Sequence, residues 1–497
     1  MTAAQASGKS NVIEAFGVDT IPDSERIGRP RDVVGVLVGS NMSFGTILFG
    51  WLPVAFGLDF WASVTAMAVG TFIGILLVAP LSVISMHTRT NLSTSSGATF
   101  GVRGRLIGSG IGLLLALGYT ALIVWTGGGL VVGLLDRFMG VPDTGWTYAI
   151  VYAAMAAMTI VIAIVGYRFV VKLNRWVVIG TLALMALGVI AYAGTFTTEA
   201  IVSEYAAGGF WQTWALAVVA VGVSGPVAYM TVLGDFTRYI SPRLVSPNKV
   251  LRATGLGLFF GLFIPQLFGT FTALAARASE DYVTSLVNTA PIWFLIPLAF
   301  SGLFGTLGNS SMLVYDMGLD LDAIVPRLRR TTATAAVAAV AVVLVFMGHF
   351  VWNAEDAITA FVLMLTVLGT PWAVITLIGH ADRKGRYDVD ALQVYNRRAR
   401  GGIYWYRGGW SMQAAFAWII GAGVGLLGVD TVLYRGPLLD LTGGVDGSFL
   451  IAGALSGAAY LAMTRRSSPG GGLNAGSSSS ADDAPVRVEP FHPHRQQ

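Results

Sequence analysis

The sequence GSNMSFG, residues 39–45, interrupts an apolar stretch that is otherwise long enough to cross a membrane as a helix. A second interruption, GVSGP at residues 222–226, lies inside another such stretch. Glycine and proline weaken a helix, and proline also removes a backbone hydrogen-bond donor. Inside a bilayer the freed backbone groups must be satisfied by protein or by a water-filled cavity. The pair of breaks therefore predicts two discontinuous helices that meet at a binding site near the middle of the membrane.

The composition shows that most of the chain has no water-facing side. Of its 497 residues, 54% are hydrophobic and 12% are charged, whereas a soluble domain carries roughly 25% charged residues. Twelve uncharged, mostly apolar stretches are each long enough to cross a bilayer as a helix. They cover residues 33–57, 60–86, 106–135, 146–165, 176–196, 213–234, 253–276, 291–315, 331–350, 357–379, 410–429 and 448–464. The predicted fold class is an all-α polytopic membrane protein with about 12 transmembrane helices.

The distribution of lysine and arginine predicts the orientation. With a cytoplasmic N-terminus, 28 of the 31 Lys and Arg residues fall in inward loops or tails, and the three exceptions are Arg137, Arg277 and Arg435. The positive-inside rule expects such an asymmetry. We therefore expect a multi-pass protein of the plasma (inner) membrane with both termini in the cytoplasm. The N-terminal segment 1–32 is expected to be cytoplasmic, and the Gly/Ser-rich tail 467–497 is expected to be disordered.

The first ten spans divide into two blocks of nearly equal length. Spans one to five cover 164 residues (33–196), and spans six to ten cover 167 residues (213–379). Two blocks with an odd number of spans lie oppositely in the membrane, as in inverted-repeat transporters. The first span of each block carries one of the two breaks, at a similar depth. The spans within 410–464 remain as a peripheral pair.

The absence of charge inside the spans bears on the chemistry. None of the twelve stretches contains Asp, Glu, Lys or Arg, and charged substrates usually require a buried counter-charge. A neutral substrate is therefore favoured, held by amides, hydroxyls and aromatic faces. A coupling ion would be sodium, held by carbonyl, hydroxyl or amide oxygens, or a proton carried through water and loop carboxylates. There is no cysteine, and the five histidines lack ligand spacing, so we expect no cofactor and no enzyme.

Three segments resemble one known family. IPDSERIGRPRD (21–32) precedes span one, TNLSTSSGATFGVRG (90–104) follows span two, and GDFTRYISPR (234–243) follows span six. These motifs are similar to those of the nucleobase:cation symporter-1 family, which contains purine, cytosine, allantoin and hydantoin permeases. The resemblance implies a five-plus-five inverted-repeat (LeuT-type) core with two peripheral helices. It also implies alternating access with one cation carried per substrate.

The resemblance also implies a set of substrate-binding residues. An aromatic residue in span three and another at the break of span six hold a planar ring in this family. The first position falls on Tyr119, and the second falls on Pro226, for which Tyr229 is the nearest aromatic replacement. An amide in span eight would read the edge of the ring. The full expected set is Tyr119, Ile123, Gly225, Pro226, Tyr229, Asn309, Asn41 and Ser43, with Thr126 on the same face of span three and Trp125 off that face as a structural residue.

The cation site that the resemblance implies lies between spans one and eight. Carbonyl groups of span one would come from Gly39 and Met42, and span eight would add a carbonyl and two hydroxyls. The hydroxyl positions fall on Gly308 and Asn309, although a shift of register would bring in Ser310 and Ser311. The expected set is Gly39, Met42, Gly305, Gly308, Asn309 and Ser310. Sodium and proton coupling both stay open.

One charged pair lies at the inner end of span six. Asp235 and Arg238 are three residues apart, the spacing at which side chains on one helix meet. The pair is expected to be either an exposed helix-end ion pair that contributes little or a gating contact that breaks during transport.

Other classes of protein fit the sequence less well. A six-plus-six facilitator would have a long loop after span six, whereas residues 236–252 form a short one. A membrane enzyme would need clustered reactive groups, and His87, His349 and His380 stand alone at span ends. We expect a cation symporter that imports a small, neutral, planar solute of the cytosine, purine, uracil or allantoin and hydantoin class. The alternatives are a proton-coupled transporter of another small neutral solute on the same fold and a non-transporting membrane sensor. The expected partners are this solute and the lipid bilayer but no nucleic acid, with the chain a monomer or a weak oligomer.

Overall fold

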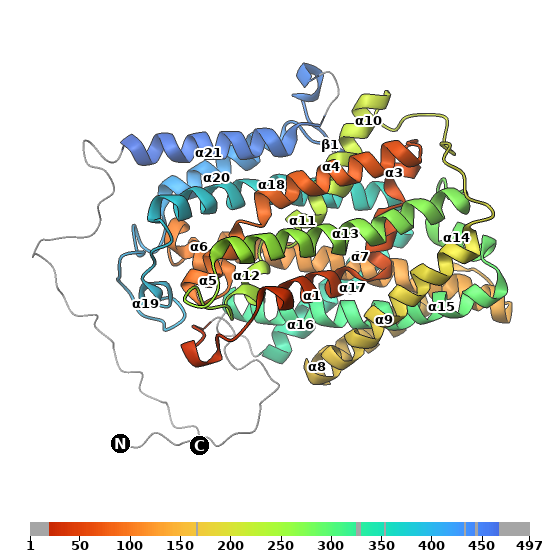
Figure 1. Cartoon of the computed structure of the whole chain (residues 1–497), viewed down its shortest axis with the longest axis horizontal. Helices are drawn as coiled ribbons and strands as arrows, with labels where there is room; N and C mark the ends of the chain where they lie inside the picture. Colours follow the sequence, from red (N-terminus) through yellow and green to blue (C-terminus); the bar gives the residue numbers. More distant parts are fainter. Residues whose placement is uncertain are drawn as a thin grey trace, which may run out of the picture.

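The computed structural model is almost entirely helical (Figure 1). It describes residues 19–165, 167–324, 330–351, 354–431, 434–442 and 446–466. The tail 467–497 and the first 18 residues of the predicted N-terminal segment lie outside the described residues.

The first five predicted spans coincide with helices of the N-terminal half. Span one consists of α1 (Pro30–Asn41), α2 (Phe44–Phe49) and α3 (Leu52–Ala55), and span two of α4 (Phe60–Val78) and α5 (Leu81–Thr88). Spans three to five are α7 (Leu106–Met139), α8 (Gly145–Val165) and α9 (Tyr167–Tyr192), with η1 (Asp23–Glu25) before span one and α6 (Leu92–Phe100) after span two.

The second half repeats this arrangement. Span six consists of α10 (Phe210–Ala217), the π-helical turn η2 (Val218–Val223), α11 (Ser224–Val227) and α12 (Leu233–Thr237), and span seven is α13 (Pro247–Ala275). After α14 (Tyr282–Thr289), span eight consists of η3 (Ile292–Phe294), α15 (Leu295–Phe300), the π-helical turn η4 (Ser301–Gly305) and α16 (Thr306–Ile324). Spans nine to twelve are α17 (Arg330–Phe350), α18 (Ala354–Arg383), α20 (Met412–Leu426) and α21 (Ser448–Arg466). The short elements that connect them are α19 (Val389–Leu392), β1 (Asp430–Thr431), β2 (Tyr434–Arg435) and η5 (Leu439–Thr442).

The lengths of the helices are consistent with the predicted count of spans. Among the described residues, seven helices are long and apolar enough to cross a membrane, and the bent pair in span one makes eight. Three shorter apolar helices coincide with spans five, nine and eleven. The last predicted span is α21, whose 19 residues pack against α20.

Glycines on α13 allow the broken span one to lie directly against it. A methyl group at Gly269 would overlap the Ile47 carbonyl oxygen, and one at Gly50 would overlap the Gln266 carbonyl. Thr270 fills the same crossing by donating its hydroxyl to the Gly50 carbonyl at 2.7 Å. Small residues that bring helix backbones together are the usual device of helix association in membranes. This contact holds the second half of span one, α2 and α3, against span seven.

Spans two and six join the same group of helices. A methyl group at Gly222 would lie 2.5 Å from the Cα atom of Gly70, so η2 and α4 also cross at backbone contact. Nearer the arginine-rich end, the Thr237 hydroxyl donates to the Ser82 carbonyl at 2.7 Å and connects α12 to α5. Spans one, two, six and seven therefore form one packed unit.

Spans three, four, eight and nine form a second unit around α7. A methyl group at Gly127 would overlap the Thr306 side chain of α16, and one at Gly128 would lie 2.5 Å from the Tyr152 ring of α8. One at Gly348 of α17 would lie 3.0 Å from the Trp125 ring. In Figure 1, α20 and α21 lie beside α18 at one edge of the molecule, which is the peripheral position expected for the last two spans.

The arginine-rich end is covered by loops whose cations bind helix-end carbonyls. Arg26 is only 2% exposed and donates to the carbonyls of Arg238, Met86 and Ile240 at 3.1, 2.5 and 2.5 Å. The predicted cytoplasmic segment before α1 is thereby attached to the ends of α5 and α12. On the other side, Arg105 donates to the Asn396 side chain. Burial lowers the pKa of Arg105 to about 10, which leaves its guanidinium charged at neutral pH.

Candidate substrate site at the helix breaks

The break in span one lies where the sequence predicts it. Helix α1 ends at Asn41, α2 begins at Phe44, and the two are bent by 73°. Ser43 starts the new helix, because its hydroxyl oxygen accepts the Thr46 N–H at 3.3 Å. The Asn41 amide donates to the Leu37 carbonyl at 2.8 Å. Both polar side chains thus satisfy backbone groups of the break itself, in addition to any contact with a ligand.

The break in span six lies further along the chain than predicted. Residues Gly222 to Pro226 are helical, first as the π-turn η2 and then as α11, and regular helix is lost only between Val227 and Leu233. The wider π-turn accommodates a proline, which has no N–H to donate, and the Ser224 hydroxyl donates to the Ala220 carbonyl at 2.6 Å. The predicted break at the GVSGP sequence is therefore corrected to residues 228–232.

The two breaks meet through a pair of hydroxyl groups. The Ser40 Oγ atom lies 3.0 Å from the Tyr229 hydroxyl, which comes from the interrupted segment of span six. Ser40 precedes the break in span one by only two residues, so the contact lies where the two interrupted spans meet. The polar atoms exposed by one break are thus brought next to those of the other, as the paired interruptions predict.

Span three supplies aromatic and aliphatic residues beside this junction. A methyl group at Gly45 would lie 3.4 Å from Ile123, so the start of α2 faces α7 at this point. Tyr119 lies one turn earlier and packs edge-on against Phe361 of α18, with ring centroids 5.4 Å apart. Its ring centroid lies 6.1 Å from that of Phe49. The expected residues Tyr119, Ile123 and Tyr229 therefore lie together around the broken span.

Gly225 and Pro226 both contact other helices of the first unit. A methyl group at Gly225 would lie 3.2 Å from Leu262 of α13, and the Pro226 ring lies against Gly74 of α4. Both residues are therefore packing contacts within the first helix unit. Pro226 is buried, whereas Gly225 keeps part of its surface exposed, and the expectation that both border a ligand stays a prediction.

The residues expected to bind a cation are brought together only in part. A methyl carbon built on Gly39 would lie 3.6 Å from the side chain of Val178 in α9. One built on Gly305 would lie 3.9 Å from the adjacent Val177. Spans one and eight therefore both contact the same turn of span five. Met42 is buried in the break itself.

The serine pair of span eight is directed elsewhere. The Ser310 hydroxyl lies 2.8 Å from that of Thr159 in α8 and donates to the Thr306 carbonyl, and Ser311 donates to the Thr159 carbonyl. A register shift that brings Ser310 into the cation site is therefore not seen. Gly308 is buried in α16, and Asn309 is partly exposed. Within the described part of the chain, the Asn309 amide has no hydrogen-bond partner, so it is free to bind a ligand.

Ser301 is a polar residue that the sequence analysis missed. Its hydroxyl is buried, lies 3.6 Å from a methyl carbon built on Gly305, and has no hydrogen-bond partner among the described residues. Its sequence, SGLFG at 301–305, has the same small and polar character as the break in span one, and this pattern could have revealed it.

The charged pair at the end of span six differs from an ordinary surface pair. Asp235 and Arg238 approach to 3.7 Å, but Arg238 is 2% exposed whereas Asp235 is 40% exposed. The Arg238 carbonyl also accepts the Arg26 side chain. The pair is therefore part of the packed arginine-rich end, and the expectation of an exposed helix-end pair is corrected.

Comparison with known proteins identifies the family. The sequence pattern of the permeases for cytosine/purines, uracil, thiamine and allantoin matches residues 20–455. The chain belongs to this family. Its relatives in this permease family include the putative purine-cytosine permease YxlA of Bacillus subtilis, which is 23% identical over 471 residues, covering 91% of this chain and 96% of that protein.

Solved structures show that this permease shares the fold of Mhp1, described as a nucleobase-cation-symport-1 family transporter. The inward-facing conformation of Mhp1 matches with a TM-score of 0.71 and 18% identity. The closed conformation with bromovinylhydantoin bound matches with a TM-score of 0.67 and 16% identity. Each comparison covers 92% of this chain and 96% of the other. The predicted inverted-repeat membrane fold is confirmed, and the protein is a multi-pass transporter of the nucleobase permease type, not an enzyme.

Proposed function

We propose that this permease imports a small, neutral, planar nucleobase-like solute by cation symport with alternating access. The observation that carries the proposal is the contact between Ser40 and Tyr229, which joins the two helix breaks, while Tyr119 lies against Phe49 of the same broken span one. None of the twelve apolar stretches of the sequence contains Asp, Glu, Lys or Arg. A solute recognised there is therefore bound by ring stacking and by uncharged hydrogen-bonding groups.

Each residue of the proposed site has a separate role. Tyr119 offers an aromatic face, and stacking on such a face contributes about 0.5–1.5 kcal/mol beyond burial. The Asn309 amide can donate and accept at once, which suits an amide-like ring edge with adjacent N–H and C=O groups. The Tyr229 and Ser40 hydroxyls can exchange their mutual bond for bonds to the solute, and Ile123 closes the site on the side of α2.

The proposed coupling ion is sodium. The carbonyl groups of Gly39, Met42 and Gly305 and the unpaired hydroxyl of Ser301 are uncharged oxygen donors, the ligand type that hard cations prefer. These donors come from spans one and eight, which belong to the two different helix units. An ion held between them would stabilise one relative position of the units. Proton coupling is the second candidate, because the span-eight serine pair is directed toward α8.

Alternating access would occur by movement of one unit against the other. Spans one, two, six and seven pack on one another through backbone contacts, and spans three, four, eight and nine do so around α7. Arg26, Asp235 and Arg238 hold the ends of the first unit together at the arginine-rich side. We place that side in the cytoplasm of a plasma-membrane protein, with both termini inside, and we divide the repeats at 33–196 and 213–379.

A ligand panel tests the substrate class. Cytosine, uracil, hypoxanthine, allantoin and hydantoin are added to the purified protein, and the unfolding temperature is measured. A ligand that binds only the folded state stabilises it by about 2.7 kcal/mol at 100 times its Kd, so at least one compound should raise the midpoint clearly. Orotate, which is uracil with an added carboxylate, should leave the unfolding midpoint unchanged. If no member of the panel has an effect, or if orotate stabilises as well as uracil, the proposed substrate class is wrong.

The same measurement tests the ion. If sodium binds at Gly39, Met42 and Gly305, the affinity for the active compound should increase in sodium relative to choline, and sodium affinity should increase by the same factor with the compound present. Ser301→Ala should reduce this factor. If affinity and uptake do not depend on sodium but uptake depends on an imposed pH gradient, proton coupling is supported instead.

Cysteine labelling tests the orientation. The chain has no cysteine, so single cysteines are clean reporters. Cysteines placed at the exposed positions Ser203 and Ser279 should react with an impermeant thiol reagent added to intact cells. A cysteine at Ser246, also exposed but at the arginine-rich end, should react only after permeabilisation. Labelling of Ser246 from outside would contradict the proposed topology.

A further inference from the structure

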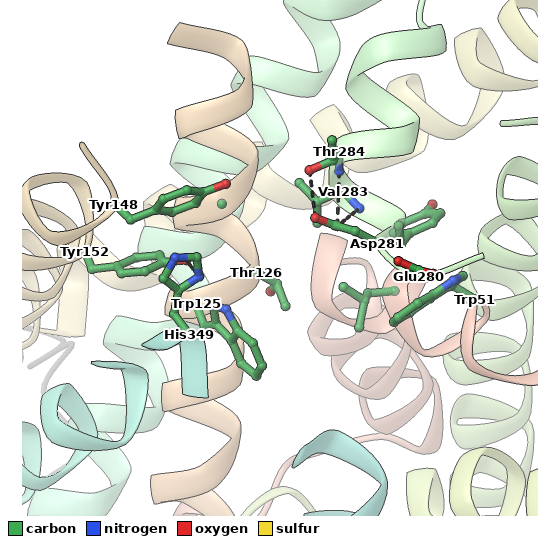
Figure 2. A pocket seen from close by; sticks show the side chains of 13 residues that line it. Trp51, Trp125, Thr126, Tyr148, Tyr152, Glu280, Asp281, Val283, Thr284 and His349 are labelled. Carbon is green, nitrogen blue, oxygen red and sulfur yellow. Dashed lines mark hydrogen bonds between the residues drawn. The ribbon is translucent and has the colours of Figure 1, made fainter. Parts of the chain in front are cut away.

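A cavity of about 220 Å³ opens between the two helix units near the arginine-poor end. The cavity is far larger than the space that one ordered water needs, and it is enough for one small ring. In Figure 2, Tyr148, Tyr152, His349 and Trp125 lie on one side of the gap, while Trp51, Glu280 and Asp281 lie on the other. The cavity is thus bordered by aromatic rings from the second unit and by carboxylates on the opposite side.

The cavity is separate from the proposed central site. Thr126, which lines it, lies one turn beyond Ile123 on α7, and Ile123 contacts the start of α2 at Gly45. The Thr126 hydroxyl donates to the Leu122 carbonyl at 2.8 Å. The contact between Gly45 and Ile123 therefore lies between the cavity and the junction of Ser40 with Tyr229.

Several aromatic groups in the cavity are held rigidly. The His349 ring packs on Tyr148 with centroids 4.0 Å apart, and its Nδ1 atom lies 3.2 Å from the Tyr152 hydroxyl. Across the gap, the Trp51 indole donates to the Ala278 carbonyl at 2.8 Å and its ring stacks on Tyr282. Asp281 is likewise occupied, because its carboxylate caps α14 by accepting the N–H groups of Val283 and Thr284.

Two polar groups in the cavity are not occupied. The Trp125 indole N–H and the exposed Glu280 carboxylate make no hydrogen bond with any residue that the structure describes. Trp125 packs on Gly348, so its ring is positioned by α17. The indole is a donor only, and the carboxylate is an acceptor only. They lie on opposite sides of the same cavity (Figure 2).

We infer that this cavity is a second, outer binding site for a neutral planar ring that carries both a carbonyl group and an N–H group. The carbonyl accepts the Trp125 N–H, the ring N–H donates to Glu280, and the ring face packs against the surrounding aromatic side chains. The inference rests on the proposed function for the kind of solute. The site holds the solute before the contact between Gly45 and Ile123 opens toward the central site.

A cysteine at Gly129 tests the outer site directly. Gly129 lines the cavity, and the atom nearest to a methyl group built on it is 3.9 Å away, so a cysteine fits there. In purified Gly129→Cys protein, cytosine, uracil, hypoxanthine and allantoin are tested for slowing the reaction with a methanethiosulfonate reagent. At least one should slow it, and its half-protecting concentration should be unchanged when Asn309→Ala weakens binding at the central site.

Two conservative variants and one control assign the protection to the cavity. Trp125→Phe keeps a ring but loses the N–H, and it should raise the half-protecting concentration about 5-fold, while Glu280→Gln should raise it about 10-fold. Glu199→Gln, an exposed carboxylate outside the cavity, should have no effect. The inference of an outer site is wrong if protection disappears with Asn309→Ala. It is also wrong if neither Trp125→Phe nor Glu280→Gln changes the protection. If compounds of the panel raise the unfolding temperature but none slows labelling, the outer site is wrong and the proposed function stands. If they do neither, both fail.

Discussion

Asn309→Ala is expected to weaken binding of the active nucleobase or ureide by roughly 5- to 150-fold. The Asn309 amide is partly exposed and has no hydrogen-bond partner among the described residues, so the bonds lost on its removal are those to the solute. Polar atoms left unpaired in a closed site cost about 1–3 kcal/mol, and about 1.4 kcal/mol corresponds to a tenfold change in Kd. Affinity is measured in detergent on protein that elutes as a single species, because lost uptake alone could reflect lost folding.

Tyr119 provides the companion measurement for the ring face. Tyr119→Ala should weaken binding several-fold, whereas Tyr119→Phe should have a small effect because it keeps the ring. Asn248→Ala, an exposed amide at the start of α13, is the matched control and should bind like the parent. If well-folded Asn309→Ala and Tyr119→Ala both bind like the parent, the proposed site is misplaced, although the family assignment would be unaffected.

Gly269→Ala is expected to lower the free energy of unfolding by about 3 kcal/mol or to prevent folding. A methyl group at this position overlaps the Ile47 carbonyl oxygen, which belongs to the backbone of α2 and cannot rotate away as a side chain could. Overpacking of a close contact typically costs about 1–3 kcal/mol and sometimes more. The separation of α2 and α13 would also break the hydrogen bond from Thr270 to Gly50.

Gly35→Ala is the matched control, because a methyl group at Gly35 in α1 meets no atom within 4 Å. Alanine is favoured over glycine inside a helix by about 1 kcal/mol, so this variant should be at least as stable as the parent. The two variants are compared by thermal unfolding, in which the loss of monodisperse protein is measured as the temperature rises. Equal midpoints for the two variants would show that α2 and α13 do not cross as closely as described.

The spans and the first break can be predicted from the sequence because they depend on local properties. Long uncharged stretches must be helical in a bilayer, since every backbone polar group needs an internal partner, and each predicted span coincides with a helix or a series of helices. The GSNMSFG sequence breaks span one because Ser43 can cap a new helix. The three family motifs were likewise contiguous segments, readable without any knowledge of packing.

The second break shows where local reasoning is insufficient. Glycine and proline at 222–226 weaken a helix, but close packing of Gly222 on Gly70 and a π-turn keep this segment helical. Tertiary contacts outweigh the local preference, and the interruption falls at Tyr229 and its neighbours instead. The direction in which Gly225 and Pro226 point follows from the same packing.

The fold class, the positions of the apolar stretches and the transporter family could therefore be predicted from the sequence, because each depends on composition or on contiguous motifs. Which side chains meet depends on the packing of the helices. The Ser310 hydroxyl contacts that of Thr159, while the Ser301 hydroxyl has no partner among the residues that the structure describes. Arg238 is buried, and its carbonyl accepts the Arg26 side chain from the segment before α1. Trp125, expected to be only structural, lines the outer cavity. A one-residue step rotates a side chain by about 100° around a helix, so the partner of each residue depends on how neighbouring helices are packed and rotated, which no local pattern specifies.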